Sequence, residues 1–200
     1  MLDSPLRPFI ERALKQTAVF IANQGVSANV LTTLGLCFGV IATFSVALGN
    51  FPLALICAGL SRLFDGLDGM VARQNGPTEL GGYYDILADF TFYAILPVGF
   101  VFYDPTRNGV AGAVLLAGFF SNATSFLGFA ILAEKRALQT QANGKKSHFH
   151  SVGLIEGTET IVFFALCLVW PTLFAPLSFV LSGLIALTVC HRVYNARKIF

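Results

Sequence analysis

Long apolar stretches, separated by short polar turns, constrain the fold of this chain more than any other feature. Each stretch approaches the roughly 20 residues that an α-helix needs to cross the hydrocarbon core of a bilayer. Hydrophobic residues make up 55% of the chain and charged residues only 12%, which leaves too little polar surface to cover a soluble globule. We therefore predict an all-α integral membrane protein with six transmembrane helices, at 29–48, 51–73, 81–102, 111–133, 153–170 and 173–191.

The predicted spans are joined by turns and by one longer loop. Glycine and proline end helices, which places turns at 49–52 and 75–77. The polar stretch 104–109 is predicted as a third turn, and residues 134–151 as a loop. Proline residues near 171 and 176 separate the last two spans.

An amphipathic segment precedes the first span. From Leu6 to Ile21, apolar residues recur with the period of a helix, and Arg7, Arg12 and Lys15 lie on the opposite side. This pattern is typical of a helix that lies in the membrane interface, and packing against a soluble partner is the alternative. We predict a juxtamembrane amphipathic segment at 1–26 and a six-helix transmembrane domain at 27–200.

Positive charges are distributed unequally between the two ends of the predicted spans. One end of the predicted bundle carries a single basic residue, Arg107, and the opposite end carries the other twelve. Basic residues are retained on the cytoplasmic side of membranes, so the end with twelve is predicted to be cytoplasmic. We therefore expect a multi-pass protein of the cytoplasmic (inner) membrane with both termini in the cytoplasm. The other twelve basic residues are Arg7, Arg12, Lys15, Arg62, Arg73, Lys135, Arg136, Lys145, Lys146, Arg192, Arg197 and Lys198.

Four aspartates lie between positions 65 and 89, at the cytoplasmic ends of the predicted second and third spans. An aspartate at the centre of a membrane helix costs roughly 2.5–3.5 kcal/mol, so four would cost on the order of 10 kcal/mol. That cost is comparable to the whole stability of a domain and has to be offset. Divalent cations are the natural candidates, and intramembrane carboxylates indicate function.

The spacing of these carboxylates places them on two helix faces. Asp65 and Gly69 are one turn apart, with Asp68 beside them, and Asp85 and Asp89 are one turn apart on the next helix. The turn at 75–77 makes the two helices antiparallel, so that each presents a carboxylate pair to the other. Carboxylate oxygens suit Mg²⁺ or Mn²⁺. The alternative is a helical hairpin in which the carboxylates only form ion pairs.

The sequences DGLDGMVAR and GGYYDILAD resemble the signature of the CDP-alcohol phosphotransferase (CDP-alcohol phosphatidyltransferase) family. That signature reads D-x-x-D-G-x-x-A-R, a spacer, and G-x-x-x-D-x-x-x-D. The spacer here has seven residues, where the usual form has eight. The fixed positions are filled by Asp65, Asp68, Gly69, Ala72, Arg73, Gly81, Asp85 and Asp89.

The resemblance implies an enzyme of phospholipid biosynthesis. Its transmembrane domain would be catalytic and would transfer a phosphatidyl group from CDP-diacylglycerol to an alcohol, with release of CMP. It implies a two-ion Mg²⁺ or Mn²⁺ site held by Asp65, Asp68, Asp85 and Asp89, with Asp89 also acting as the general base. The CDP moiety would be bound by Gly69, Ala72, Arg73 and Gly81.

The acceptor alcohol cannot be read from the sequence, but several polar residues reach the depth of the acidic cluster. Those that could contact an acceptor are Lys135, Arg136, Glu156, Glu159 and Arg192. The two glutamates could instead cap a helix, where carboxylates favour the N-terminal dipole. The basic residues could instead contact anionic lipid headgroups.

The expected partners are the CDP-diacylglycerol donor, a small or lipid alcohol acceptor and the membrane, with no nucleic acid. The family resemblance also implies a homodimer. Two other functions remain open: a cation transporter that uses the carboxylates as its ion path, and a catalytically inactive family member. A transporter is disfavoured because the predicted spans carry no acidic residue near their outer ends.

Overall fold

The computed structural model describes residues 3–142, 155 and 157–200, and the regular structure of these residues is entirely helical. A short 3₁₀ helix, η1 (Pro171–Leu173), lies between the last two α-helices. The α-helices are α1 (Asp3–Asn23), α2 (Ala28–Ala47), α3 (Phe51–Asn75), α4 (Glu79–Tyr103), α5 (Pro105–Ala142), α6 (Gly157–Val169) and α7 (Phe174–Ile199).

Helix α2 forms the centre of one half of the bundle, because it packs against both α3 and α4 along their lengths. Helices α3 and α4 touch each other over only a short stretch. Glycine permits the close approach of α2 and α4: a Cβ atom on Gly99 would lie 2.6 Å from the carbonyl oxygen of Thr43. Helix α5 packs against α4 and α7, and α6 packs against α3.

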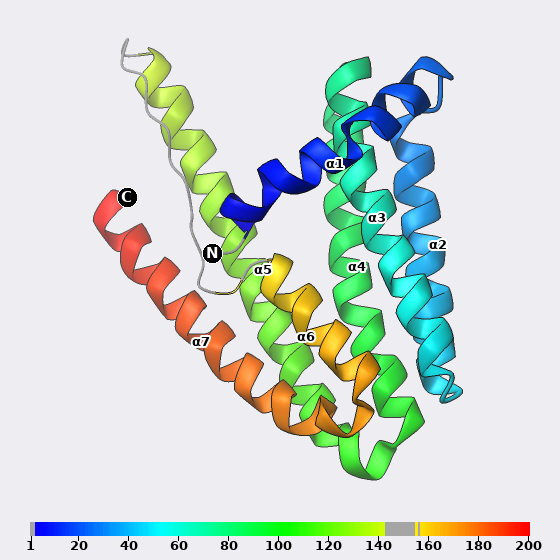
Figure 1. Cartoon of the computed structure of the whole chain (residues 1–200). Coiled ribbons are helices and arrows are strands. Elements are labelled where there is room, and N and C mark those ends of the chain that lie inside the picture. Colours follow the sequence, from blue (N-terminus) through cyan, green and yellow to red (C-terminus); the bar gives the residue numbers. More distant parts are fainter. Residues whose placement is uncertain (1–2, 143–154, 156) are drawn as a thin grey trace.

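Helix α1 runs obliquely across the bundle at the end where α2 begins, α3 ends and α4 begins (Figure 1). It packs against α3, and the apolar contacts include Leu14, Ala18 and Ile21 of α1 with Leu67 and Val71 of α3. The helix extends a few residues beyond the predicted 6–21 at both ends. Its location in the membrane interface stays a prediction.

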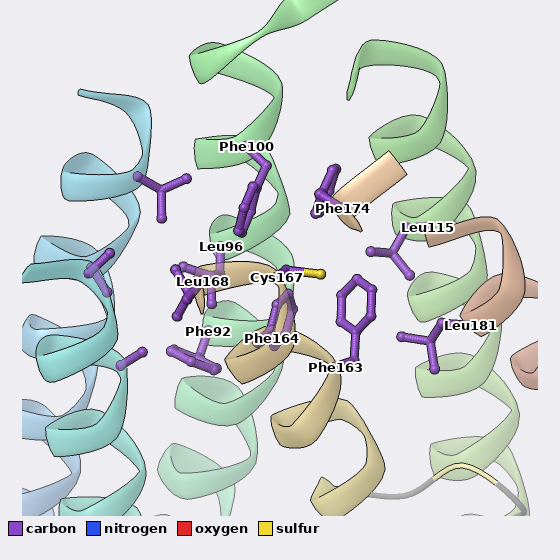
Figure 2. Packing of buried hydrophobic residues seen from close by; sticks show 14 of the residues in the cluster. Phe92, Leu96, Phe100, Leu115, Phe163, Phe164, Cys167, Leu168, Phe174 and Leu181 are labelled. Atoms are coloured by element: carbon purple, nitrogen blue, oxygen red, sulfur yellow. The ribbon is translucent and has the colours of Figure 1, made fainter. Parts of the chain in front are cut away.

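The main core is formed by buried residues of α2, α3, α4, α5, α6 and α7, and Figure 2 shows how they pack. Aromatic rings from α4, α6 and α7 fill it, and Phe100 stacks on Phe174 with ring centroids 4.3 Å apart. Phe92 makes edge contact with Phe164. This packing fixes α4 in place, so that its polar first turns are held beside α2 and α3.

Among the described residues, four helical segments are long and apolar enough to cross a membrane: α2, α4, residues 105–136 of α5, and η1 with α7. Large apolar side chains such as Phe44 and Phe120 are exposed on the protein surface, as expected for contact with lipid. Helix α6 has 13 residues, and α3 carries Arg62, Asp65 and Asp68 within its apolar part. The number of six spans therefore stays a prediction.

Two boundaries of the fourth predicted span were wrong. The turn expected at 104–109 is confined to Asp104, because α5 begins at Pro105. Asp104 accepts a 3.0 Å hydrogen bond from the backbone N–H of Arg107, and a capping aspartate followed by proline is a strong helix start. The loop was also expected from 134, but residues 134–142 are good helix formers and continue α5 to Ala142. The rest of the expected loop, 143–151, lies outside the described residues.

The turns predicted around residues 49 and 76 are confirmed. Gly49 and Gly76 have positive φ angles of 76° and 93°, which favour glycine. After the second turn, the side chain of Thr78 accepts a 3.0 Å hydrogen bond from the N–H of Gly81 and caps α4. This capped start sets the direction in which α4 presents its carboxylates.

Candidate active site

Three carboxylates meet where α3 and α4 approach each other. Asp65 and Asp68 come from α3 and Asp85 from α4, and one oxygen of each lies within 4.8 Å of the others. Asp68 is only 3% exposed, and the other two side chains are half-buried. This donor set is chemically suited to Mg²⁺ or Mn²⁺, because these cations take carboxylate oxygens as ligands. Asp65 and Asp68 are three residues apart, so both lie on the side of α3 that meets Asp85.

Helix α2 supplies a residue to this site that the sequence analysis did not identify. The hydroxyl of Thr32 lies 2.6 Å from Oδ2 of Asp68, and both side chains are buried. The bond holds one oxygen of the Asp68 carboxylate in place. A threonine in an apolar helix carries no signal of such a role, and its contribution follows only from the packing of α2 between α3 and α4.

The fourth aspartate, Asp89, lies beside this group but has a different partner. Its Oδ1 accepts a 2.6 Å hydrogen bond from Nη1 of Arg62, which also lies 3.6 Å from Oδ1 of Asp65. The Asp89 side chain is about one-third exposed, at 34%. The structure thus brings all four predicted carboxylates to one region, with three forming a compact group and Asp89 paired with arginine.

A cavity of about 260 Å³ opens next to the three-carboxylate group. Asp68, Gly69 and Ala72 line it from α3, and Gly81 and Asp85 line it from α4. The start of α2 and the turn between α3 and α4 complete the wall. Gly69, Ala72 and Gly81, three of the four residues predicted to bind the nucleotide, therefore line one cavity.

The packing favours glycine at position 81 of this wall. A Cβ atom there would lie 2.9 Å from the capping hydroxyl of Thr78 and 3.3 Å from Oδ1 of Asn29. A Cβ atom at the neighbouring Gly82 would meet nothing within 4 Å. Of the two neighbouring glycines, only Gly81 is thus constrained by its contacts, and Gly81 is the one at the motif spacing from Asp85 and Asp89.

Arg73, the last residue of the first motif half, is not part of the cavity wall. Its Nη2 lies 3.0 Å from Oε1 of Glu11 on α1, and both side chains are about half exposed. The pair links the oblique helix α1 to the end of α3. An exposed ion pair of this kind is weak, so the guanidinium can be recruited by a stronger anion.

A second cavity, of about 840 Å³, lies between α4, α5, α6 and α7. Asp89 lines it, together with Asn122, Thr160 and Arg192, and most of its remaining wall is apolar or aromatic. Asp85 faces the smaller cavity and Asp89 the larger one, so the acidic cluster lies between the two.

The five candidate acceptor-binding residues have different positions. Arg192 lines the larger cavity, is 6% exposed, and donates hydrogen bonds to Asn122 and Ser125 of α5. Lys135 and Arg136 are exposed on α5, and Glu159 is half-buried in the first turn of α6. None of these three lines either cavity. Glu156 lies outside the described residues.

The fold and the site together define a multi-pass helical membrane protein with a carboxylate cluster placed between two cavities. The chain belongs to the CDP-alcohol phosphatidyltransferase family, whose model matches residues 25–193. The chain is 40% identical to the inner membrane protein YnjF of Escherichia coli, over 98% of this chain and 95% of the relative. It is also 31% identical to the archaetidylinositol phosphate synthase of Pyrococcus horikoshii, over 43% of this chain and 46% of that protein.

Solved structures with the same fold include the phosphatidylinositol phosphate synthase PgsA1 of Mycobacterium tuberculosis. Its structure with CDP-DAG bound aligns with a TM-score of 0.69 at 18% identity, over 92% of each chain. Its complex with manganese and citrate aligns with a TM-score of 0.64 at 18% identity, over 90% of this chain and 86% of that one. The family match and the fold support a transferase of phospholipid synthesis.

Proposed function

We propose that the protein transfers a phosphatidyl group from CDP-diacylglycerol to an alcohol and releases CMP. The observation that carries this proposal is the meeting of three motif aspartates beside a cavity walled by Gly69, Ala72 and Gly81 of the same motif. Phosphoryl transfer depends on positioning and on neutralising charge, which such a site provides. The CDP-DAG complex of the structural neighbour is consistent with this donor.

The smaller cavity is proposed to receive the CDP moiety. Gly69, Ala72 and Gly81 offer little side-chain bulk, so phosphates and ribose can approach the helix backbones. Arg73 would leave its exposed pair with Glu11 to bind a donor phosphate. Asp65, Asp68, Asp85 and Asp89 would hold a pair of Mg²⁺ or Mn²⁺ ions, which when bound would supply charge neutralisation to the phosphates.

The larger cavity is proposed to receive the acceptor alcohol. Asp89 would accept the proton of the acceptor hydroxyl, whose oxygen forms a bond to the phosphorus that carries the diacylglycerol group. The bond between that phosphorus and the CMP oxygen breaks, and CMP leaves with the electron pair. Arg192 would face an anionic group on the acceptor, because it lines the same cavity as Asp89.

The acidic cluster is proposed to face the cytoplasm. The ends of α3, α5 and α7 and the starts of α2 and α4 lie toward the same end of the molecule (Figure 1). Most of the basic residues counted above belong to this end, and basic residues are retained on the cytoplasmic side. We therefore propose that both termini and the donor cavity lie on the cytoplasmic side, where CDP-linked lipids and soluble alcohols meet.

The test is CMP release by the purified protein in detergent, with CDP-diacylglycerol as donor and a panel of alcohols as acceptors. The panel should contain inositol phosphate, glycerol phosphate, serine and phosphatidylglycerol, each with Mg²⁺, with Mn²⁺ and with EDTA. Release that needs both metal and one of these alcohols supports the proposal and identifies the acceptor. Absence of release and of CDP-lipid binding would contradict it.

A further inference from the structure

We propose that Arg62 is a positioning residue, which holds the carboxylate of Asp89 at the boundary between the two cavities. The inference rests on the proposed function, since it assigns a partner to the general base of that reaction. Arg62 lines neither cavity, so it would act through Asp89 and not by contact with substrate.

The contact between Arg62 and Asp89 is short and crosses from one helix to another. Nη1 of Arg62 on α3 lies 2.6 Å from Oδ1 of Asp89 on α4, slightly shorter than the roughly 2.7–2.9 Å that is typical of charge-assisted N–H···O hydrogen bonds. The bond engages one carboxylate oxygen of Asp89, and the Asp89 residue lines the larger cavity. Asp65 lies further away, at 3.6 Å from the same nitrogen.

The guanidinium is itself fixed by its surroundings. Its central carbon lies 4.0 Å from the centroid of the Phe92 ring and 5.7 Å from that of Tyr93. Nη2 donates a 3.3 Å hydrogen bond to the hydroxyl of Ser61, and the Arg62 side chain is only 12% exposed. A charged group in this setting loses little further freedom when it holds a carboxylate.

Phe92, the ring beneath the guanidinium, is also held in place. It is 1% exposed, and its Cδ2 atom lies where a Cβ atom on Gly39 of α2 would be only 2.8 Å away. Glycine at position 39 thus lets the ring fit against α2. Arg62, Asp89 and Phe92 form a unit in which α2, α3 and α4 all take part, which is the arrangement needed to position a base.

Lysine would be a poor substitute at position 62. Arginine offers a planar cation that stacks on an aromatic face and donates in several directions at once. Here the guanidinium donates hydrogen bonds to Asp89 and Ser61, and its planar face lies over the ring of Phe92. Arg62→Lys keeps the charge and removes the planar geometry, so it separates the effect of positioning from that of charge.

The first experiment is a double-mutant cycle on CMP release with Arg62→Met, Asp89→Asn and both together. We expect Arg62→Met to lower kcat about 100-fold, the size of loss that a misplaced catalytic group produces, with the KM for CDP-lipid changed less than about threefold. Arg62→Lys should recover part of the loss. Since Arg62 acts through Asp89, the double variant should be no slower than Asp89→Asn.

The matched control is Arg107→Met, which removes another arginine that links distant segments, through a 2.9 Å bond to the carbonyl of Thr172. This variant should keep the kcat of the wild type. Full activity of Arg62→Met, or losses that multiply in the double variant, would overturn the inference. Size-exclusion chromatography and CDP-lipid binding verify that each variant is folded.

A second experiment needs no turnover. The rise in thermal unfolding temperature with Mn²⁺ gives an apparent affinity for the cation. Arg62→Met removes the positive charge that lies beside the carboxylates of Asp89 and Asp65. Because that charge repels a cation, we expect Mn²⁺ to bind about tenfold more tightly to the variant. When Arg62→Met is combined with Asp89→Asn, most of this gain in Mn²⁺ affinity should be lost. An unchanged or weaker Mn²⁺ response in Arg62→Met would contradict the inference.

The two experiments separate the two proposals. If the wild type releases no CMP with any acceptor, the proposed function fails, and the Mn²⁺ response alone decides whether Arg62 acts on Asp89. If the wild type is active and only the Arg62 predictions fail, the proposed function stands without this positioning residue.

Discussion

Thr32 of α2 donates a 2.6 Å hydrogen bond to Asp68 of α3, so a helix outside the sequence motif takes part in the candidate metal site. Both groups are buried, and a buried carboxylate without a partner is costly. Thr32 therefore orients a metal-facing carboxylate in the way that outer-shell residues orient metal ligands elsewhere.

Thr32→Val should weaken this orientation with little change in shape. We expect Mn²⁺ affinity to fall about 10- to 100-fold, in line with the loss of such outer-shell partners. Thr32→Ser should retain most of the affinity, because it keeps the hydroxyl. The measurement is the Mn²⁺-dependent shift of the unfolding temperature. The control is Thr33→Val, since Thr33 is exposed and its hydroxyl contacts Tyr84 instead; equal losses in both variants would count against the assignment.

Asp85→Asn removes the only carboxylate that α4 contributes to the three-carboxylate group. We expect the stabilisation by Mg²⁺ or Mn²⁺ to disappear and CMP release to fall below detection. Asp104→Asn is the control, because Asp104 caps α5 at the start of that helix and asparagine caps helices equally well. A normal metal response in Asp85→Asn would exclude the proposed ligand set.

Glu11→Gln should free Arg73 from α1 without altering the cavity wall. An exposed ion pair contributes about 0.2–1 kcal/mol, so we expect the KM for CDP-diacylglycerol to fall by up to about fivefold. Arg73→Met should raise that KM, since it removes the proposed phosphate ligand. Steady-state CMP release over a range of donor concentrations measures both. A higher KM in Glu11→Gln would show that the pair assists donor binding.

Gly99→Ala tests the close packing of α2 against α4. The new Cβ atom would lie 2.6 Å from the carbonyl oxygen of Thr43 and 3.2 Å from Cβ of Val46, so the helices must separate. We expect a loss of about 1–3 kcal/mol in the free energy of unfolding. Gly59→Ala, on the exposed side of α3 with nothing within 4 Å, should be neutral or stabilising by up to about 1 kcal/mol. Equal stability of the two variants would contradict this packing.

The sequence predicted those parts of the structure that depend on local pattern. Apolar runs and glycine turns located the helices, as Gly49 and Gly76 show, because both features act within a few residues. Predicted helix boundaries were wrong where two features of the sequence indicated different structures. At 104–109 the polar residues indicated a turn, yet Asp104 and Pro105 form a helix start, and α5 absorbs the rest.

The site was predictable to the extent that helical spacing determines it. The one-turn separation of Asp85 and Asp89 placed both on one side of α4, but not on the same cavity. The roles of Thr32 and Arg62 depend on how α2, α3 and α4 pack, over sequence separations of 36 and 27 residues. No periodic pattern carries that information, so these partners emerge only from the structure.

The most direct test of the central claim compares CMP release from CDP-diacylglycerol by the wild type and by Asp89→Asn, with acceptor and Mn²⁺ present. We predict metal-dependent release by the wild type that stops with EDTA, and only a small residual rate of release by Asp89→Asn, although this variant still binds CDP-lipid. Release by Asp89→Asn at the rate of the wild type would contradict the assigned base. Failure of the wild type to release CMP or to bind CDP-lipid would contradict phosphatidyl transfer itself.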